Sequence, residues 1–181
     1  TKIWNAYRLI QGWKKEDKPA NEAEIQTIEW FGNQLNKTIV EIDDQFSKFR
    51  ISDGLHLIYK LIWDDFCSWY LEAIKPNYGE GISQEVYDKT IAYFEELMKL
   101  LHPFMPFLTE ELWQNIAERT PENALIISQQ KKAENVNNKK LEEFDFAKEL
   151  ISGVRNYRQS KGISPREAVV VYTNALSFEN E

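Results

Sequence analysis

The sequence is poor in cysteine, glycine and proline. Its 181 residues include 1 Cys, 7 Gly and 6 Pro. A single cysteine rules out an intrachain disulfide and a cysteine-ligated zinc site, and it favours a reducing compartment. So few turn-forming residues argue against an all-β fold with many tight turns. No apolar run approaches the ~18 residues of a membrane-spanning helix, and no signal segment opens the chain. We therefore expect a cytoplasmic protein without a membrane partner.

Acidic residues outnumber basic ones, 29 to 22. The formal net charge is -7, which disfavours a protein that binds phosphate backbones regardless of sequence. A protein that reads a few particular bases is not excluded, because basic residues can gather locally. They do so in two segments near the ends of the chain: Lys2, Arg8, Lys14, Lys15 and Lys18, and then Arg155, Arg158, Lys161 and Arg166.

The sequence contains no recognisable catalytic or metal-binding set. Only 2 histidines are present, and Asp53 with His56 is the nearest approach to the Glu-x-x-His pattern of di-metal bundles. Adjacent acids such as Asp64 and Asp65 do not face one another on a helix. Cys67 has no activating base nearby in the sequence, so we expect a small packed side chain. No glycine-rich phosphate loop occurs, and neither independent catalysis nor a metal site is expected.

Apolar residues recur at helical spacing along most of the chain. We expect Asn21, Ser83 and Thr109 to be N-caps, and Ser52-Asp53-Gly54 to break the chain between the second and third helices. Residues 168–173 are β-branched and predict a strand. A lone strand is unstable, so its partner would be Ala124–Ser128 or a strand outside this sequence. The predicted helices cover residues 2–15, 21–49, 55–75, 83–101, 109–116 and 139–161.

Aromatic residues are concentrated in the third predicted helix, where residues 63–72 read WDDFCSWYLE. Helical spacing places Phe66 and Trp69 on the core face, together with Leu55, Tyr59 and Ile62, and Tyr70 lies beside this stripe. By the same spacing Trp63, Leu71 and Glu72 point elsewhere. Aromatic side chains away from the core either pack on a second helix or offer a surface for stacking on bases.

Four segments together resemble the anticodon-binding domain of class I aminoacyl-tRNA synthetases. Residues 2–9 (KIWNAYRL) are similar to the opening helix of that domain, and residues 63–72 to the form it takes in the valyl-tRNA synthetases. Residues 100–113 (LLHPFMPFLTEELW) resemble a segment shared by the valine, isoleucine and leucine enzymes. Residues 154–165 resemble the valine-specific segment that leads into a small α/β region. The order and spacing of all four segments fit this family.

The resemblance implies a mostly α-helical bundle over residues 1–138, with a last helix and strand over 139–181 that begin a small α/β tail. It further implies that the bundle grips the anticodon stem-loop of valine tRNA and adjoins a catalytic domain of the same chain. That absent domain would use ATP and Mg, so we expect a non-catalytic piece of a longer, monomeric ligase that needs no cofactor itself. Two alternatives stay open: the same domain from an isoleucine or leucine enzyme, and a helical protein-interaction domain without an RNA role.

The resemblance also implies which residues meet the anticodon. On the first helix Leu9 stands where relatives often have Phe, so it offers apolar contact without a ring. On the third helix Glu72 is suited to accept a hydrogen bond from the exocyclic amine of cytosine. The structural alternatives are that Asn5 and Arg8 interact with a neighbouring helix, that Glu72 pairs with Lys75, and that Leu71 belongs to the core. The full set of predicted contact residues is Lys2, Asn5, Arg8, Leu9, Leu71, Glu72 and Lys75.

Overall fold

The computed structural model describes residues 2–164 and 166–172, and these are mostly α-helical, as predicted. They divide into two compact units, the first ending at Leu141 and the second beginning at Glu142. None of the described helices is long and apolar enough to cross a membrane. The elements in chain order are α1 Lys2–Gln11, β1 Lys15–Glu16, α2 Glu22–Ser47, α3 Ile51–Lys60, η1 Leu61–Tyr70, α4 Leu71–Ile74, β2 Ile82–Ser83, α5 Gln84–Leu101, α6 Pro106–Ile116, η2 Pro121–Asn123, η3 Leu125–Ile127 and α7 Asn138–Lys161.

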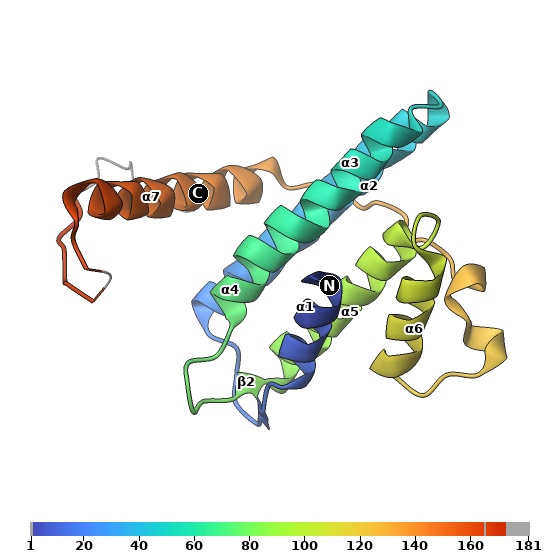
Figure 1. The fold of residues 1–181 in the computed structure, drawn as a ribbon, viewed down its shortest axis with the longest axis horizontal. Helices are drawn as coiled ribbons and strands as arrows, with labels where there is room; N and C mark the ends of the chain where they lie inside the picture. The colour runs from blue at the N-terminus through green and yellow to red at the C-terminus, as the bar shows by residue number, and fades with distance from the viewer. Residues whose placement is uncertain (1, 165, 173–181) are drawn as a thin grey trace. The chain divides into compact units, whose positions relative to one another are not determined.

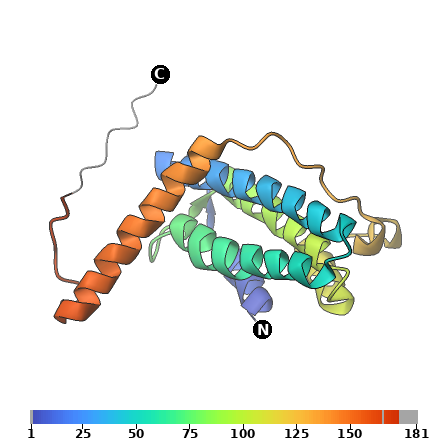
Figure 2. The same ribbon diagram turned by 90° about the horizontal axis from the view of Figure 1, so that it is seen from above.

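The first unit is a bundle built around a long helical hairpin. The helix α2 runs antiparallel to the continuous rod formed by α3, η1 and α4, and α5 packs against α2 (Figures 1 and 2). The helices α1 and α6 in turn pack against α5. At the centre, the ring of Phe31 lies 4.9 to 5.3 Å, centroid to centroid, from the rings of Phe66, Tyr70 and Tyr93. These rings fix how α2, η1 and α5 meet, and so determine which faces of the bundle point outward.

The helix α2 begins where its sequence predicts and ends before the predicted break. Asn21 Oδ1 accepts from the Glu24 amide at 2.9 Å, and Glu24 Oε2 accepts from the Asn21 amide at 2.8 Å, which completes a capping box. The helix ends at Ser47, and Phe49 adopts a positive φ of 58°. The predicted break at Ser52-Asp53-Gly54 is wrong, because these residues already form the first turn of α3.

The third predicted helix changes character partway along, because Leu61–Tyr70 forms a π-helix with i to i+5 hydrogen bonding. The amide of Leu71 donates to the Phe66 carbonyl in this pattern. The wider turns place buried residues four apart, at Ile58, Ile62, Phe66, Tyr70 and Ile74. The predicted core positions Ile62 and Phe66 are confirmed, but Leu55 and Tyr59 are exposed, and Trp69 is only half-buried.

A short parallel β-pair, which the sequence did not predict, joins distant parts of the bundle. Lys15 and Glu16 of β1 pair with Ile82 and Ser83 of β2. The amide of Ile82 also donates to the Lys14 carbonyl at 2.8 Å. The chain that leaves α1 is thereby fastened to the chain that leaves α4 (Figure 1).

The cap predicted for α5 is confirmed, whereas that for α6 is not. Ser83 Oγ accepts from the Val86 amide at 3.2 Å and caps α5. The helix α6 instead begins at Pro106, so Thr109 lies within its first turn. Its hydroxyl donates to the Met105 carbonyl at 2.9 Å and lies 2.8 Å from His102 Nδ1. A proline at the first helical position is already fixed in φ, which explains the earlier start.

The second unit contains most of α7, which confirms the last predicted helix. Within α7, the guanidinium of Arg158 donates to two carbonyls of the segment that follows the helix, those of Ser164 and Glu167, both at 2.8 Å. No strand forms over residues 168–172, so that prediction is wrong for them, and Thr173 lies outside the described residues. In the first unit, the extended segment predicted at Ala124–Ser128 is instead the short 3-10 helix η3.

Candidate nucleic-acid interface

The helix α1 buries one face and presents the other to solvent. Ile3, Ala6 and Ile10 recur at spacings of three and four and lie in the core, where each is at most 6% exposed. Because one turn of helix takes 3.6 residues, the side chains between them point outward. That outer face carries four of the predicted contact residues, all exposed: Lys2, Asn5, Arg8 and Leu9.

A lysine fixes the start of α1 to the π-helix. Lys2 Nζ donates to the Trp63 carbonyl at 3.1 Å, and the Ser68 hydroxyl donates to the same carbonyl at 2.8 Å. Burial raises the pKa of the neighbouring Cys67 thiol to about 11, an effect that the charge of Lys2 partly offsets. The thiol is therefore protonated at neutral pH, in keeping with its predicted role as a packed side chain. The ammonium of Lys2 has three donors and uses one of them here, so it can still bind another acceptor.

The three predicted contact residues at α4 differ in exposure. Glu72 Oε2 pairs with Lys75 Nζ at 3.2 Å, and the two side chains are 56% and 46% exposed. Such an exposed pair contributes at most about 1 kcal/mol, so an incoming ligand can replace it. Leu71 is only 2% exposed and packs in the core, so its side chain has no surface to offer a base.

Arg8 and Asn5 complete the outer face of α1. The guanidinium carbon of Arg8 lies 5.7 Å from the centroid of the Trp4 ring, one turn earlier, which is a cation–π arrangement. Among the described residues no carboxylate pairs with Arg8, so its charge is not neutralised by a neighbouring helix. The charge of this guanidinium and the amide of exposed Asn5 are therefore both directed to solvent.

The segments that follow α1 and α4 are joined by the β1–β2 pair. The helix α4 stops before Lys75-Pro76, as predicted, because the residue before a proline is disfavoured in the helical region. A turn then leads to Gly81, where an added Cβ would lie 2.6 Å from the Lys14 carbonyl, so only glycine allows this approach. Lys14 itself is 76% exposed and pairs loosely with Glu16 at 3.6 Å.

Two features of this surface escaped sequence reasoning. One is the π-helix, which brings the Trp63 carbonyl to Lys2 and buries Leu71. The other is Tyr78, a fully exposed tyrosine in the turn after α4. The Asn-Tyr-Gly sequence was a usable signal for it, because Asn and Gly favour turns and turns lie at the protein surface.

The described residues hold no cluster of three or more His, Cys, Asp or Glu side chains arranged to bind a metal ion. The arrangement on α1 and α4 is instead one of separate cations, an amide, a carboxylate and an apolar side chain on an open surface. Cations contact phosphates, and amide and carboxylate groups contact base edges, where proteins recognise RNA.

Residues 29–173 match the protein family described as the anticodon-binding domain of tRNA ligase. The chain is 51% identical over 164 residues to a valine--tRNA ligase of Christiangramia forsetii, which covers 90% of the chain and 19% of that protein. Identity is 46% over 182 residues with the valine--tRNA ligase of Phocaeicola vulgatus and 30% over 181 residues with that of Thermotoga maritima, each covering 99% of the chain and 21% of the relative. The chain thus spans about a fifth of the length of these curated relatives.

Proposed function

Because the chain belongs to the family of anticodon-binding domains of tRNA ligases, we propose that it recognises the anticodon loop of valine tRNA. Its similarity to valine--tRNA ligases supports the choice of amino acid. In this proposal the joining of valine to its tRNA, with ATP and Mg, belongs to a catalytic domain of the same longer polypeptide in the cytoplasm. The chain described here would hold the tRNA in position for that domain.

The observation that carries the proposal is the exposure of polar side chains on the outer face of α1 and at Glu72 and Lys75. Sequence-specific RNA recognition targets unpaired loop bases, whose edges are free to form hydrogen bonds. Valine anticodons share an adenine and a cytosine. The Glu72 carboxylate accepts from the cytosine N4 amine in this scheme, because a carboxylate is a favourable acceptor for that donor. Lys75 occupies only Oε2 of Glu72, so Oε1 can receive the base.

The cations of the same surface contact phosphates and so fix the register of the loop. Lys2 is held by the Trp63 carbonyl and Arg8 by the Trp4 ring, so both charges are ordered before RNA arrives. Asn5 offers a hydrogen bond to a base edge, and Leu9, which is 37% exposed, offers apolar contact. Leu71 contributes indirectly, because its packing in the core holds the backbone of the neighbouring Glu72 in place.

The test compares two RNA hairpins that carry a valine anticodon loop, one natural and one with the shared cytosine replaced by uracil. Glu72→Ala should weaken binding of the natural hairpin by about 5- to 150-fold, since a specific base contact is worth ~1–3 kcal/mol. It should leave the uracil hairpin nearly unchanged. Asp64→Ala is the matched control, because it removes another exposed acid, from η1, and should affect both hairpins equally.

Equal losses on the two hairpins would show that Glu72 reads no base. Titrations with purified valine, isoleucine and leucine tRNAs separate the proposal from the first alternative. If none of the three binds at low salt, a protein-interaction domain without an RNA role replaces the proposal.

A further inference from the structure

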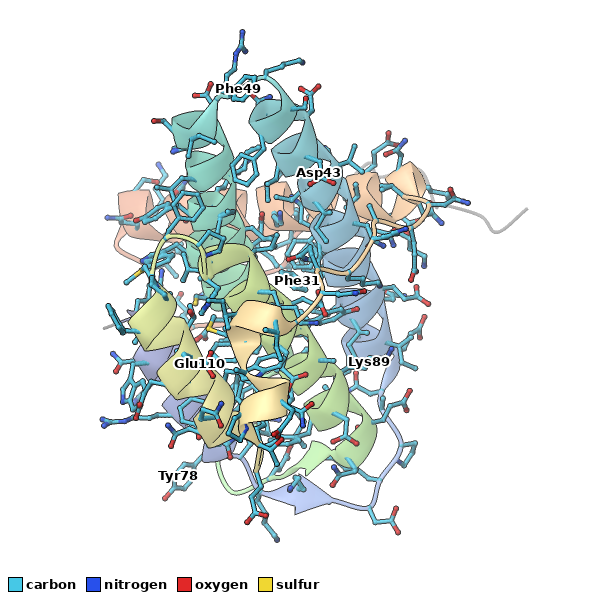
Figure 3. The ribbon with its side chains drawn as sticks, turned by 90° about the vertical axis from the view of Figure 1, so that its right-hand side faces the viewer. Phe31, Asp43, Phe49, Tyr78, Lys89 and Glu110 are labelled. Atoms are coloured by element: carbon cyan, nitrogen blue, oxygen red, sulfur yellow. The ribbon has the colours of Figure 1, made fainter. Side chains whose placement is uncertain are left out.

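Tyr78 is an aromatic side chain with no structural partner. It is 108% exposed, which is full exposure, so no neighbouring side chain covers its ring. Among the described residues it takes part in no hydrogen bond, ion pair or ring contact. Other aromatic side chains are also well exposed, but Phe49 lies at the opposite end of the bundle (Figure 3). Tyr78 differs from Phe49 in its neighbours, because it follows the predicted contact residue Lys75 closely in the chain.

The turn that carries Tyr78 is firmly held. The Glu80 amide donates to the Asn77 carbonyl at 3.0 Å, and the Asn77 side-chain amide donates to Glu80 Oε2 at 3.1 Å. Gly79 adopts a φ of 86°, a conformation that favours glycine. Pro76 restricts the chain before the turn. The ring of Tyr78 therefore projects from a defined backbone and loses little conformational entropy when it packs on a ligand.

The position of the turn places Tyr78 beside the candidate interface. Only Pro76 and Asn77 separate it from Lys75, the predicted contact residue that directly follows α4. The β1–β2 pair joins this turn to the end of α1, and Lys14 lies at that junction (Figure 1). Lys75 pairs with Glu72 and Lys14 with the half-buried Glu16, and phosphate groups can displace these surface ion pairs.

We propose that Tyr78 is a stacking platform for one unpaired base of the RNA loop that the chain binds. A ring free on its faces can stack on any base, and cations such as Lys75 and Lys14 attract the phosphates of the same strand. Leu9 has no π-face, so Tyr78 supplies a contact that Leu9 cannot. This inference rests on the proposed function and adds to it a residue from outside α1 and α4.

The experiment uses the 181-residue chain and the natural hairpin, with 2-aminopurine placed at one loop position at a time. Stacking on an aromatic ring quenches the fluorescence of this base analogue. We expect the unchanged chain and Tyr78→Phe to quench one loop position, whereas Tyr78→Leu loses that quenching. Its affinity should fall by about 5- to 150-fold, the equivalent of ~1–3 kcal/mol for one stacked base. Because the side chain is fully exposed, all three proteins should fold alike, which circular dichroism checks.

Phe49→Leu, at the far end of the bundle, is the matched control and should change neither quenching nor affinity. If the unchanged chain binds the hairpin and Tyr78→Leu binds it equally well, the stacking role is overturned and the proposed function stands. Equal quenching with Tyr78→Leu would overturn the role in the same way. If the unchanged chain binds no hairpin, both proposals fall together.

Discussion

The close contact between α2 and α3 at Gly54 sets two effects of one substitution against each other. Gly54→Ala would place Cβ against Cε1 of Phe46 and 2.8 Å from its Cδ1, well inside van der Waals contact. Replacing a glycine within a helix by alanine stabilises by roughly 0.5–1 kcal/mol. Forcing a methyl group against a packed ring costs about 1–3 kcal/mol. We expect the second effect to prevail, for a net loss of about 1 kcal/mol.

Gly153→Ala provides the matched control for this prediction. Gly153 also lies inside a helix, α7, but nothing lies within 4 Å of the Cβ it would gain. That substitution should stabilise its helix by roughly 0.5–1 kcal/mol. Native-state amide hydrogen exchange measures both effects, because it reports the opening of each helix separately.

The same substitution in a chain that lacks the Phe46 ring tests whether this ring is the cause of the destabilisation. In a Phe46→Leu chain the ring that obstructs the new methyl group is gone, so Gly54→Ala should become neutral or stabilising there. This double-mutant cycle isolates the coupling between the two positions. If Gly54→Ala stabilises α3 in the unchanged chain as much as Gly153→Ala stabilises α7, the proposed steric conflict between Gly54→Ala and Phe46 is refuted.

Two further predictions concern the stability of the bundle. Asn21→Ala removes the capping box of α2 and should lower the free energy of unfolding by about 1 kcal/mol in urea titrations, and an unchanged midpoint would contradict this. Burial, aided by Glu29 and Glu134, raises the pKa of Tyr93 from 10.0 to about 12. The folded chain therefore keeps this proton to higher pH than the unfolded chain, and stability should fall as pH rises from 10 to 12. Tyr93→Phe should reduce that slope, and an identical slope would exclude Tyr93 as its source.

Local physics allowed most helix ends to be predicted from the sequence. Asn21 and Ser83 act as N-caps because their side chains satisfy amides within the next turn. Lys75-Pro76 ends α4 because proline restricts the residue before it. Each of these signals depends only on neighbours in the chain, so tertiary packing did not change the outcome.

The predictions from sequence failed at positions where packing between helices determines the local structure. Gly54 is typical of a break in isolation, but here it lets α3 approach Phe46. A regular 3.6-residue period predicts that Tyr59 is core, whereas the π-helix that follows α3 shifts the buried face. Periodicity alone does not reveal such a change, because it depends on how η1 fits the aromatic residues of α2 and α5.

The candidate site also combines correct and incorrect predictions. Asn5 and Arg8 were named from the resemblance, and the regular period of α1 places both on its exposed face. The burial of Leu71 does not follow from a regular period, because the π-helix rotates the residues after it. Whether the exposed residues read an anticodon stays a prediction that the hairpin experiments address.

The two-residue β-pair has a mechanical consequence for ligand capture. Because β1 and β2 bind the chain beyond α1 to the chain beyond α4, neither helix end can swing outward independently. A loop that touches both would meet a surface already assembled, without a hinge to close. Little of the association free energy would then be spent on ordering the protein, and most of the adaptation would fall to the RNA.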